Sequence, residues 1–315
     1  ISLGLVGAEM CIRDRLCAGR CRYPASGANF SWCTVRQGRR PDAGLNAKVN
    51  CRSRQRTGRT LLEVESKIAA LPFWSGPVTL EPLSGGLSNQ SFVAKDRSGT
   101  YVARYGHDIA VHHVIRSREA ELSRAAAELE ISPRMHWAQD GVMIFDFVEG
   151  LTYGPADLEA NIDKAVALVK RCHRELQRVV RGPGYLFWVF HVLRDYVHLL
   201  GQGPDPDNGA LARFSVIAGE LEGASGDPHI CFCHADLLAA NFIDDGFRLW
   251  LIDWEYGGIG NAWFDVGNMA AISGFERSAE ARLLASYLEG EPAEADWRRF
   301  DALRCAANLL SLIHI

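Results

Sequence analysis

Residues 229–268 read HICFCHADLLAANFIDDGFRLWLIDWEYGGIGNAWFDVGN, and this stretch decides how the rest of the chain is interpreted. It sets Asp236, Asn241 and Asp253 among short apolar runs. A carboxylate in such a run is costly to bury unless it is paired or binds a metal. A hairpin from Phe242 to Ile252 would bring Asn241 and Asp253 side by side at its open end. The pattern therefore predicts a Mg²⁺ site with oxygen ligands, and Asp236 close to it as a base.

The spacing D-x4-N-x11-D is that of enzymes that transfer phosphoryl groups, in which the first Asp accepts a hydroxyl proton. The same template requires a loop over the phosphates, a cation on the third strand and a Glu on the next helix. The segment SGGLSN at 84–89 supplies the loop and Arg104 the cation. The helix offers Glu119 and Glu121, and we expect Glu121 to pair with Arg104. All these parts in chain order are far more specific than any one of them.

The first half of the chain is expected to form a five-stranded antiparallel sheet with one helix, because short β-like runs alternate with glycine-containing turns. Strands are predicted at 78–83, 91–95, 101–105, 134–137 and 142–147, and helices at 61–71 and 116–129.

After Gly150 the apolar residues recur at helical spacing. Helices are predicted at 162–179, 188–200, 210–221, 265–272, 279–288 and 296–309, with short strands at 230–232, 241–243 and 249–252. A β-rich lobe, an apolar hinge and a helical lobe make a two-lobed α+β architecture.

Charge is distributed unevenly along the 315 residues. Residues 1–60 hold 12 Lys and Arg against 3 Asp and Glu, whereas residues 61–315 hold 22 against 35. The formal net charge of -4 gives no indication of a nucleic-acid partner. No run of 18 or more apolar residues occurs, so no membrane span is expected.

The two ends look foreign to the domain. The opening ISLGLVGAEMCIRDR and the closing LSLIHI resemble translated sequencing-adapter reads. We therefore expect residues 1–59 to be a non-native or disordered leader, 310–315 a non-native tail, and the domain to be truncated at its C-terminus. The early cysteines include no C-x2-C pair and no His precedes His107, so a structural zinc site is not expected there. Residues 60–148 then form the N-lobe and 149–309 the C-lobe.

The motifs SGGLSN, YVARYG, SREAEL, FDFVEG, CHADLLAANFI, LIDWEYGG and FDVGN follow one another between Leu61 and Asn308. In this order they resemble the choline/ethanolamine kinase-like branch of the aminoglycoside phosphotransferase family. Arg104 favours that branch, which carries Arg where most kinases carry Lys. The resemblance implies a two-lobed protein-kinase-like fold, with ATP and Mg²⁺ as cofactors.

The resemblance also implies roles for individual residues. Asp236 would orient and deprotonate the substrate hydroxyl, Asn241 and Asp253 would hold magnesium, and Arg104 would neutralise phosphate charge. His234 would brace the loop by hydrogen bonds, and Asp265 would anchor it as the N-cap of the next helix. The nucleotide would be bound by Gly85, Gly86, Ser88 and Asn89 at the phosphates and by backbone groups of Asp146, Phe147 and Val148 at the adenine.

The acceptor is expected to be a small alcohol, choline or ethanolamine. Trp254, Tyr256 and Trp263 could form a cation–π cage near the carboxylates, with ordinary core packing as the alternative. Glu255 is a further candidate, as a ligand of a second metal ion, as a residue that supports the metal site, or as an acceptor contact. Other functions stay open: an aminoglycoside or thiamine phosphotransferase, an inactive nucleotide-binding fragment, and a metal-dependent hydrolase that uses His234.

The cysteines of the central stretch bear on location. Cys231 and Cys233 alternate with Phe232 and are expected to pack as small apolar side chains, as His173 is expected to lie in the core. Reduced thiols at these positions suit a cytoplasmic enzyme. The sequence gives no indication of the oligomeric state.

Overall fold

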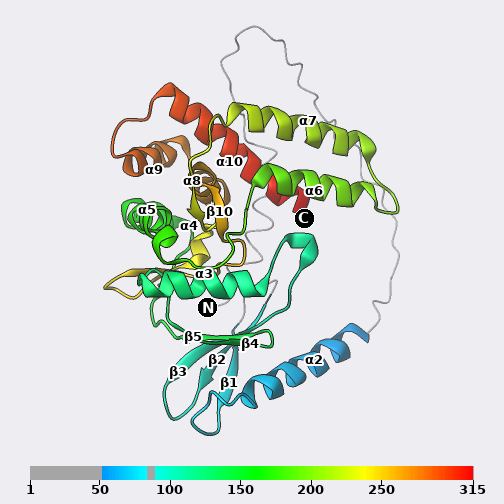
Figure 1. The fold of residues 1–315 in the computed structure, drawn as a ribbon, viewed down its shortest axis with the longest axis vertical. Coiled ribbons are helices and arrows are strands. Elements are labelled where there is room, and N and C mark those ends of the chain that lie inside the picture. Colours follow the sequence, from blue (N-terminus) through cyan, green and yellow to red (C-terminus); the bar gives the residue numbers. More distant parts are fainter. Residues whose placement is uncertain (1–51, 84–88, 315) are drawn as a thin grey trace, which may run out of the picture. The chain divides into compact units, whose positions relative to one another are not determined.

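The structure, a computed structural model, describes residues 52–83 and 89–314 (Figure 1). The chain divides into two compact units, residues 1–70 and 71–315, and each is described by itself. In the first unit α2 spans Arg52–Ala69. This helix begins earlier than the sequence predicts, because its arginine-rich first half has no apolar period although arginine favours helix. Most of the predicted leader lies outside the described residues.

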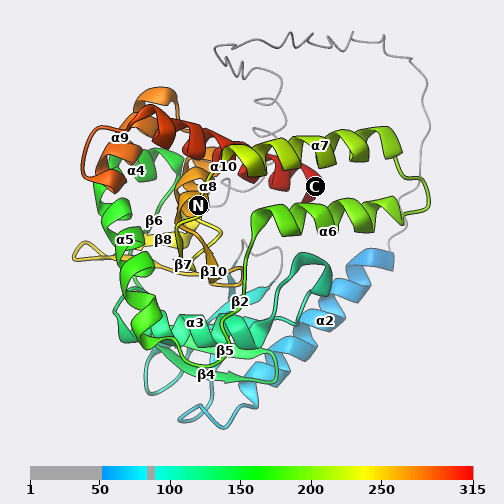
Figure 2. The same ribbon diagram turned by 45° about the horizontal axis from the view of Figure 1, so that its top comes forward.

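The second unit begins with the predicted five-stranded antiparallel sheet, in the order β1-β2-β3-β5-β4. Phe92 and Ala94 on β2, and Ala103 on β3, alternate with more exposed neighbours, so one face of the sheet is buried. Helix α3 lies along the sheet (Figures 1 and 2) and contacts β4. The bounds are β1 (Thr79–Leu83), β2 (Gln90–Lys95), β3 (Thr100–Tyr105), α3 (Arg116–Glu128), β4 (Met135–Gln139) and β5 (Val142–Asp146).

Helices dominate the rest of the unit, as predicted. A buried stripe on the last helix, including Phe300, Leu303 and Ala306, faces its neighbours. Gly267 permits the close approach of α8 and α10, since a Cβ there would lie 2.8 Å from the backbone nitrogen of Arg304. The helices are α4 (Pro155–Ala160), α5 (Ile162–Val179), α6 (Val189–Gly201), α7 (Asn208–Ala224), α8 (Ala262–Ser273), α9 (Arg277–Leu288) and α10 (Glu294–His314), and η1 (Ala110–His112) is a 3₁₀ turn.

Two small sheets lie among these helices. One pairs β7 (Ile230–Cys233) with β10 (Gly258–Asn261), and the other has the order β6 (Leu151–Thr152), β8 (Phe242–Asp244), β9 (Leu249–Leu251). The sequence does not predict β6, which has two residues, or β10, which is rich in glycine. Within residues 52–83 and 89–314, no helix has the length and apolar character to cross a membrane.

Candidate active site

The predicted hairpin is present and brings the metal candidates together. Phe242 pairs with Leu251 across β8 and β9. The main-chain amide of Ile252 donates to the carbonyl oxygen of Asn241 at 2.9 Å, so Asn241 and Asp253 lie at the open end. The side-chain amide of Asn241 donates to the carbonyl oxygen of Asp236 at 2.9 Å. The geometry therefore places all three residues of the D-x4-N-x11-D pattern in one site.

The loop that carries Asp236 is fastened to helix α8. Asp265 is fully buried, and its carboxylate accepts the main-chain amides of His234 at 2.8 Å and Ala235 at 2.7 Å. The predicted N-cap role of Asp265 is wrong: Asn261 caps α8 through its side chain, because the helix begins directly after β10. Asp265 holds the loop from inside the helix instead.

His234 braces the loop by hydrogen bonds, as expected. Its Nε2 donates to the carbonyl oxygen of Ile252 at 2.9 Å, while its Nδ1 accepts the amide of Asp236 at 3.3 Å. Burial lowers the pKa of His234, and these two partners match the neutral ring with a proton on Nε2. The ring is therefore a structural bridge between the loop and the hairpin.

Asp236 lies in an acidic environment. Burial, together with the negative charges of Asp253 and Glu255, raises the pKa of Asp236 well above its ordinary value. The carboxylates and the Asn241 amide oxygen form a hard-oxygen donor set. A divalent cation would relieve the repulsion that raises this pKa, so Asn241 and Asp253 fit a Mg²⁺ ion.

A chain of alternating charges runs from Asp253 into the sheet and helix α3. Arg104 contacts Asp253 at 2.7 Å and Glu119 at 3.0 Å. Arg116 contacts the other oxygen of Glu119 at 2.6 Å and continues to Glu255 at 3.1 Å. Burial acts against the charge on Arg104, but Asp253 and Glu119 together raise its pKa. The network fixes the Arg104 guanidinium and the Asp253 carboxylate relative to each other.

The predicted pairing of Arg104 with Glu121 is wrong; the partner is Glu119. Residues two apart on a helix point in different directions, and Glu119 is on the buried side of α3. Glu121 is half-buried and lies near Gly182, where an added Cβ would be 2.8 Å from its Oε1. The apolar residues Leu122 and Ala126 follow Glu119 by three and seven positions, a spacing that could have identified it.

The nucleotide-side residues are only partly described. Gly85, Gly86 and Ser88 lie outside the described residues, whereas the Asn89 side-chain amide donates to Glu255 at 3.3 Å.

At the predicted hinge, the amide of Asp146 donates to the Arg134 carbonyl at 2.9 Å and that of Phe147 to Thr100 at 3.4 Å. The amide of Val148 makes no hydrogen bond to any residue of 52–83 or 89–314. Of the three residues whose backbone groups are predicted to bind the adenine, Val148 is the one whose N–H is available.

The structure separates the three aromatic residues predicted near the acceptor. Trp254 is 1% exposed, donates to the Ser132 hydroxyl at 2.7 Å and packs on His234, so its predicted place in a cage is wrong. Trp263 is also buried and packs against Tyr287 and Arg299, on a cavity that none of the three pattern residues lines. Core packing, the alternative, describes both.

Tyr256 is the aromatic residue that the structure keeps near the carboxylates. It is half-buried, and burial, followed by the charges of Glu255 and Asp236, raises the pKa of its hydroxyl. Its ring meets Phe187 edge to face. Tyr256 remains a predicted acceptor contact.

Sequence reasoning missed two arginines of α3. Arg116 carries the ion pair between Glu119 and Glu255, and Arg118 donates to the main-chain oxygen of Glu255 at 3.3 Å. Both are almost fully buried. The i,i+3 spacing of Arg116 and Glu119 could have indicated the first ion pair. The second acidic partner of Arg116, Glu255, is set by tertiary contacts and could not be predicted from spacing.

Comparison with known proteins identifies the family. The family model described as "Phosphotransferase enzyme family" matches residues 79–303. The chain belongs to this family. The predicted resemblance is thereby confirmed, and the matched residues include both the five-stranded sheet and most of the helical part.

Relatives in this family include kinases of choline and ethanolamine. The chain is 24% identical over 210 residues to protein LicA of Haemophilus influenzae, covering 64% of this chain and 61% of that protein. It is 24% identical over 250 residues to mouse ethanolamine kinase 2, covering 71% of this chain and 64% of the relative. The chain thus spans somewhat less than two thirds of the length of these curated relatives.

Solved structures confirm the kinase-like fold. A choline/ethanolamine kinase family protein from Mesorhizobium loti is similar with a TM-score of 0.65 and 26% identity, over 81% of this chain and 84% of that one. Choline kinase LicA from Streptococcus pneumoniae gives 0.64 and 19%, over 81% and 88%. The ADP-bound aminoglycoside phosphotransferase APH(2'')-Ib gives 0.55 and 17%, over 77% and 85%.

Proposed function

We propose that the protein transfers the terminal phosphoryl group of ATP to the hydroxyl of a small amino alcohol, choline or ethanolamine. The observation that carries the proposal is the convergence of Asp236, Asn241 and Asp253 beside Arg104. This is the arrangement that phosphoryl transfer requires, because catalysis there rests on positioning and on charge neutralisation.

In the proposed reaction Asp236 accepts the proton of the acceptor hydroxyl as the oxygen attacks the phosphorus in line. Asn241 and Asp253 would hold Mg²⁺, which would neutralise phosphate charge. Arg104 adds a fixed positive charge at the same place, since ion pairs to Asp253 and Glu119 hold its guanidinium. His234 keeps Asp236 in position through its backbone bonds.

Two lobes would divide this work. Residues 60–148, with Asn89 and the free amide of Val148, would bind the nucleotide, and residues 149–309 would carry the catalytic loop. The cysteines among the described residues are free thiols, which supports a reducing compartment such as the cytoplasm.

A cationic acceptor is favoured by the charge of the site. Together with burial, the negative charges of Asp253 and Glu255 raise the pKa of Asp236, and Glu255 and Asp236 likewise raise that of the half-buried Tyr256, so an aromatic ring lies among these carboxylates. The names of the relatives support the same substrate class, since LicA and ethanolamine kinase 2 are among them.

The test is product identification with ATP, Mg²⁺ and a panel of choline, ethanolamine, thiamine and an aminoglycoside. We expect a phosphorylated amino alcohol and stoichiometric ADP. Asp236→Ala should abolish turnover and leave ATP binding nearly intact, whereas the matched change Asp205→Ala, at an exposed position between α6 and α7, should leave turnover unchanged.

Three outcomes would contradict the proposal. Phosphorylation of the aminoglycoside alone, or of thiamine alone, would show that the acceptor is not choline or ethanolamine. Hydrolysis of phosphate esters without ATP would make the protein a hydrolase, and ATP binding without any transfer would make it an inactive nucleotide-binding protein.

A further inference from the structure

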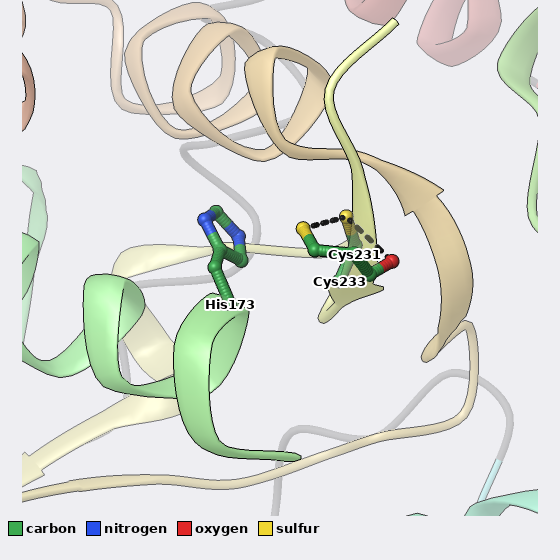
Figure 3. Close-up of side chains that lie close together, drawn as sticks. All are labelled: His173, Cys231 and Cys233. Carbon is green, nitrogen blue, oxygen red and sulfur yellow. Dashed lines mark hydrogen bonds between the residues drawn. The ribbon is translucent and has the colours of Figure 1, made fainter. Parts of the chain in front are cut away.

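Strand β7 places two cysteines on one face, directly before the catalytic loop. Cys231 and Cys233 alternate with Phe232, and their sulfur atoms lie 3.6 Å apart (Figure 3). His173 on α5 points toward them, and a donor nitrogen and the two sulfurs all lie within 4.8 Å of one another. The three side chains are buried, at 5%, 6% and 1% exposure for His173, Cys231 and Cys233.

This geometry matches soft-metal coordination. Two thiolates on one tetrahedral Zn²⁺, at about 2.3 Å each, lie about 3.8 Å apart. The sulfurs of Cys231 and Cys233 are therefore already at that separation. A ring nitrogen of His173 would have to approach them by at most about 1.3 Å, a shift within the reach of a side-chain rotation.

The surroundings supply the outer hydrogen bonds that metal-binding histidines use. One ring nitrogen of His173 lies 2.9 Å from the Tyr287 hydroxyl and the other 3.0 Å from Asp265. Whichever nitrogen binds an ion, the other keeps a partner that fixes the ring.

An ion could reach the three side chains from outside. A cavity of about 460 Å³ is lined by His173, Cys231 and Tyr287, and it leaves room for a fourth ligand from solvent. Lys170 and Arg174 also line it, and both contact Glu289, which offsets part of their charge. The basic rim disfavours hard cations, and the two sulfur atoms favour a soft metal ion that binds thiolates.

We propose that His173, Cys231 and Cys233 form a binding site for Zn²⁺, distinct from the Mg²⁺ site. The bound ion would join α5 to β7. When the ion binds Nδ1 of His173, Nε2 keeps its contact with Asp265, whose carboxylate also accepts the amide of His234, so the ion would share a hydrogen-bond network with the catalytic loop. We expect zinc to stabilise the folded protein through this link.

The experiment uses the reduced, metal-free full chain, with Co²⁺ as an optical probe. The five cysteines before residue 60 are changed to serine in all samples, so that they cannot contribute thiolates. We expect one Co²⁺ per chain with thiolate-to-cobalt charge-transfer absorption, displacement by one Zn²⁺, and a rise in Tm with Zn²⁺. Excess Mg²⁺ keeps the oxygen site occupied and gives no such absorption.

Variants decide whether these three residues are the ligands. Cys231→Ser, Cys233→Ser and His173→Asn should each weaken Co²⁺ binding at least tenfold and remove the Tm rise. Cys305→Ser, which changes a half-buried cysteine outside the cluster, should change neither. Unchanged absorption in Cys231→Ser, no charge-transfer band in the parent, or a Cys231–Cys233 disulfide that persists under reductant would each overturn the proposal.

Discussion

Replacing Glu119 by Gln should impair nucleotide use far more than replacing Glu121, its neighbour two positions along α3. Glu119 is fully buried and contacts two guanidinium groups, Arg104 at 3.0 Å and Arg116 at 2.6 Å. A glutamine at this position keeps one oxygen to accept the Arg116 hydrogen bond. It loses the charge that faces Arg104, the residue proposed to neutralise the phosphates.

The magnitude follows from the contacts that remain. Removing one partner of a buried ion pair costs about 3–5 kcal/mol when the other charge is left unpaired. Arg104 is not left unpaired, because Asp253 stays at 2.7 Å. Burial also raises the pKa of Glu119, so part of the loss is offset when that carboxylate is no longer desolvated. We expect unfolding free energy to fall by about 1–3 kcal/mol, and ATP affinity to fall by about 5- to 30-fold.

The assay pairs urea unfolding with nucleotide binding and steady-state kinetics for Glu119→Gln and Glu121→Gln. Glu121→Gln should stay within about 0.5 kcal/mol of the parent, as half-exposed substitutions usually do. Equal losses in the two variants would refute the structural assignment. A loss of stability in Glu119→Gln with unchanged ATP binding would show that the ion pair supports the fold without positioning Arg104.

Two further predictions concern the carboxylate and the rings. Burial and neighbouring charge raise the pKa of Asp236, so ionising this carboxyl group destabilises the folded state. The unfolding free energy of the metal-free protein should therefore fall as pH rises above about 4, the pKa of an unperturbed Asp. Asp236→Asn should remove that drop and gain on the order of 1 kcal/mol at pH 7 by urea unfolding; an unaltered pH profile would contradict the shift. Tyr256→Ala should raise the KM for a cationic acceptor by about 2- to 30-fold, the loss of one cation–π contact. Trp254→Phe should instead lower unfolding free energy by about 1–3 kcal/mol through its lost bond to Ser132, with that KM unchanged; a reversed pattern would return Trp254 to the acceptor site.

Local pattern was sufficient for most of the fold. The five-stranded sheet and the hairpin at 242–252 follow from short alternating runs and turn residues, which act within a few positions of the chain. Strand β10 escaped prediction because three residues of its sequence GIGN are glycine or asparagine, which are depleted in strands. It pairs with β7 on one side and lies against residues 185–187 on the other, where glycine permits the approach, since a Cβ at Gly258 would lie 2.7 Å from the Tyr185 carbonyl oxygen.

The site was predictable where spacing along the chain determines it and not where distant partners do. Asp236, Asn241 and Asp253 are fixed by one loop and one hairpin, so their convergence follows from the pattern. The burial of Trp254 depends on Ser132, which precedes it by 122 residues. The ion pair of Glu255 depends on Arg116, separated by 139 residues. The spacing of residues along a single helix or strand carries no information about such contacts.

The backbone at the two acids shows why those distant contacts matter. Ala235 and Asp253 adopt left-handed conformations, with φ of 64° and 70°, which cost a non-glycine residue about 1–2 kcal/mol each. Each is held by a charged side chain from elsewhere: Asp265 accepts the amide of Ala235, and Arg104 contacts the Asp253 carboxylate. Ala235 precedes the proposed base Asp236, and Asp253 is itself the proposed metal ligand. The distant contacts therefore keep both carboxylates in place before substrate binds. It follows that a substitution of Asp265 would displace Asp236, and a substitution of Arg104 would displace Asp253, although neither displaced carboxylate is itself altered.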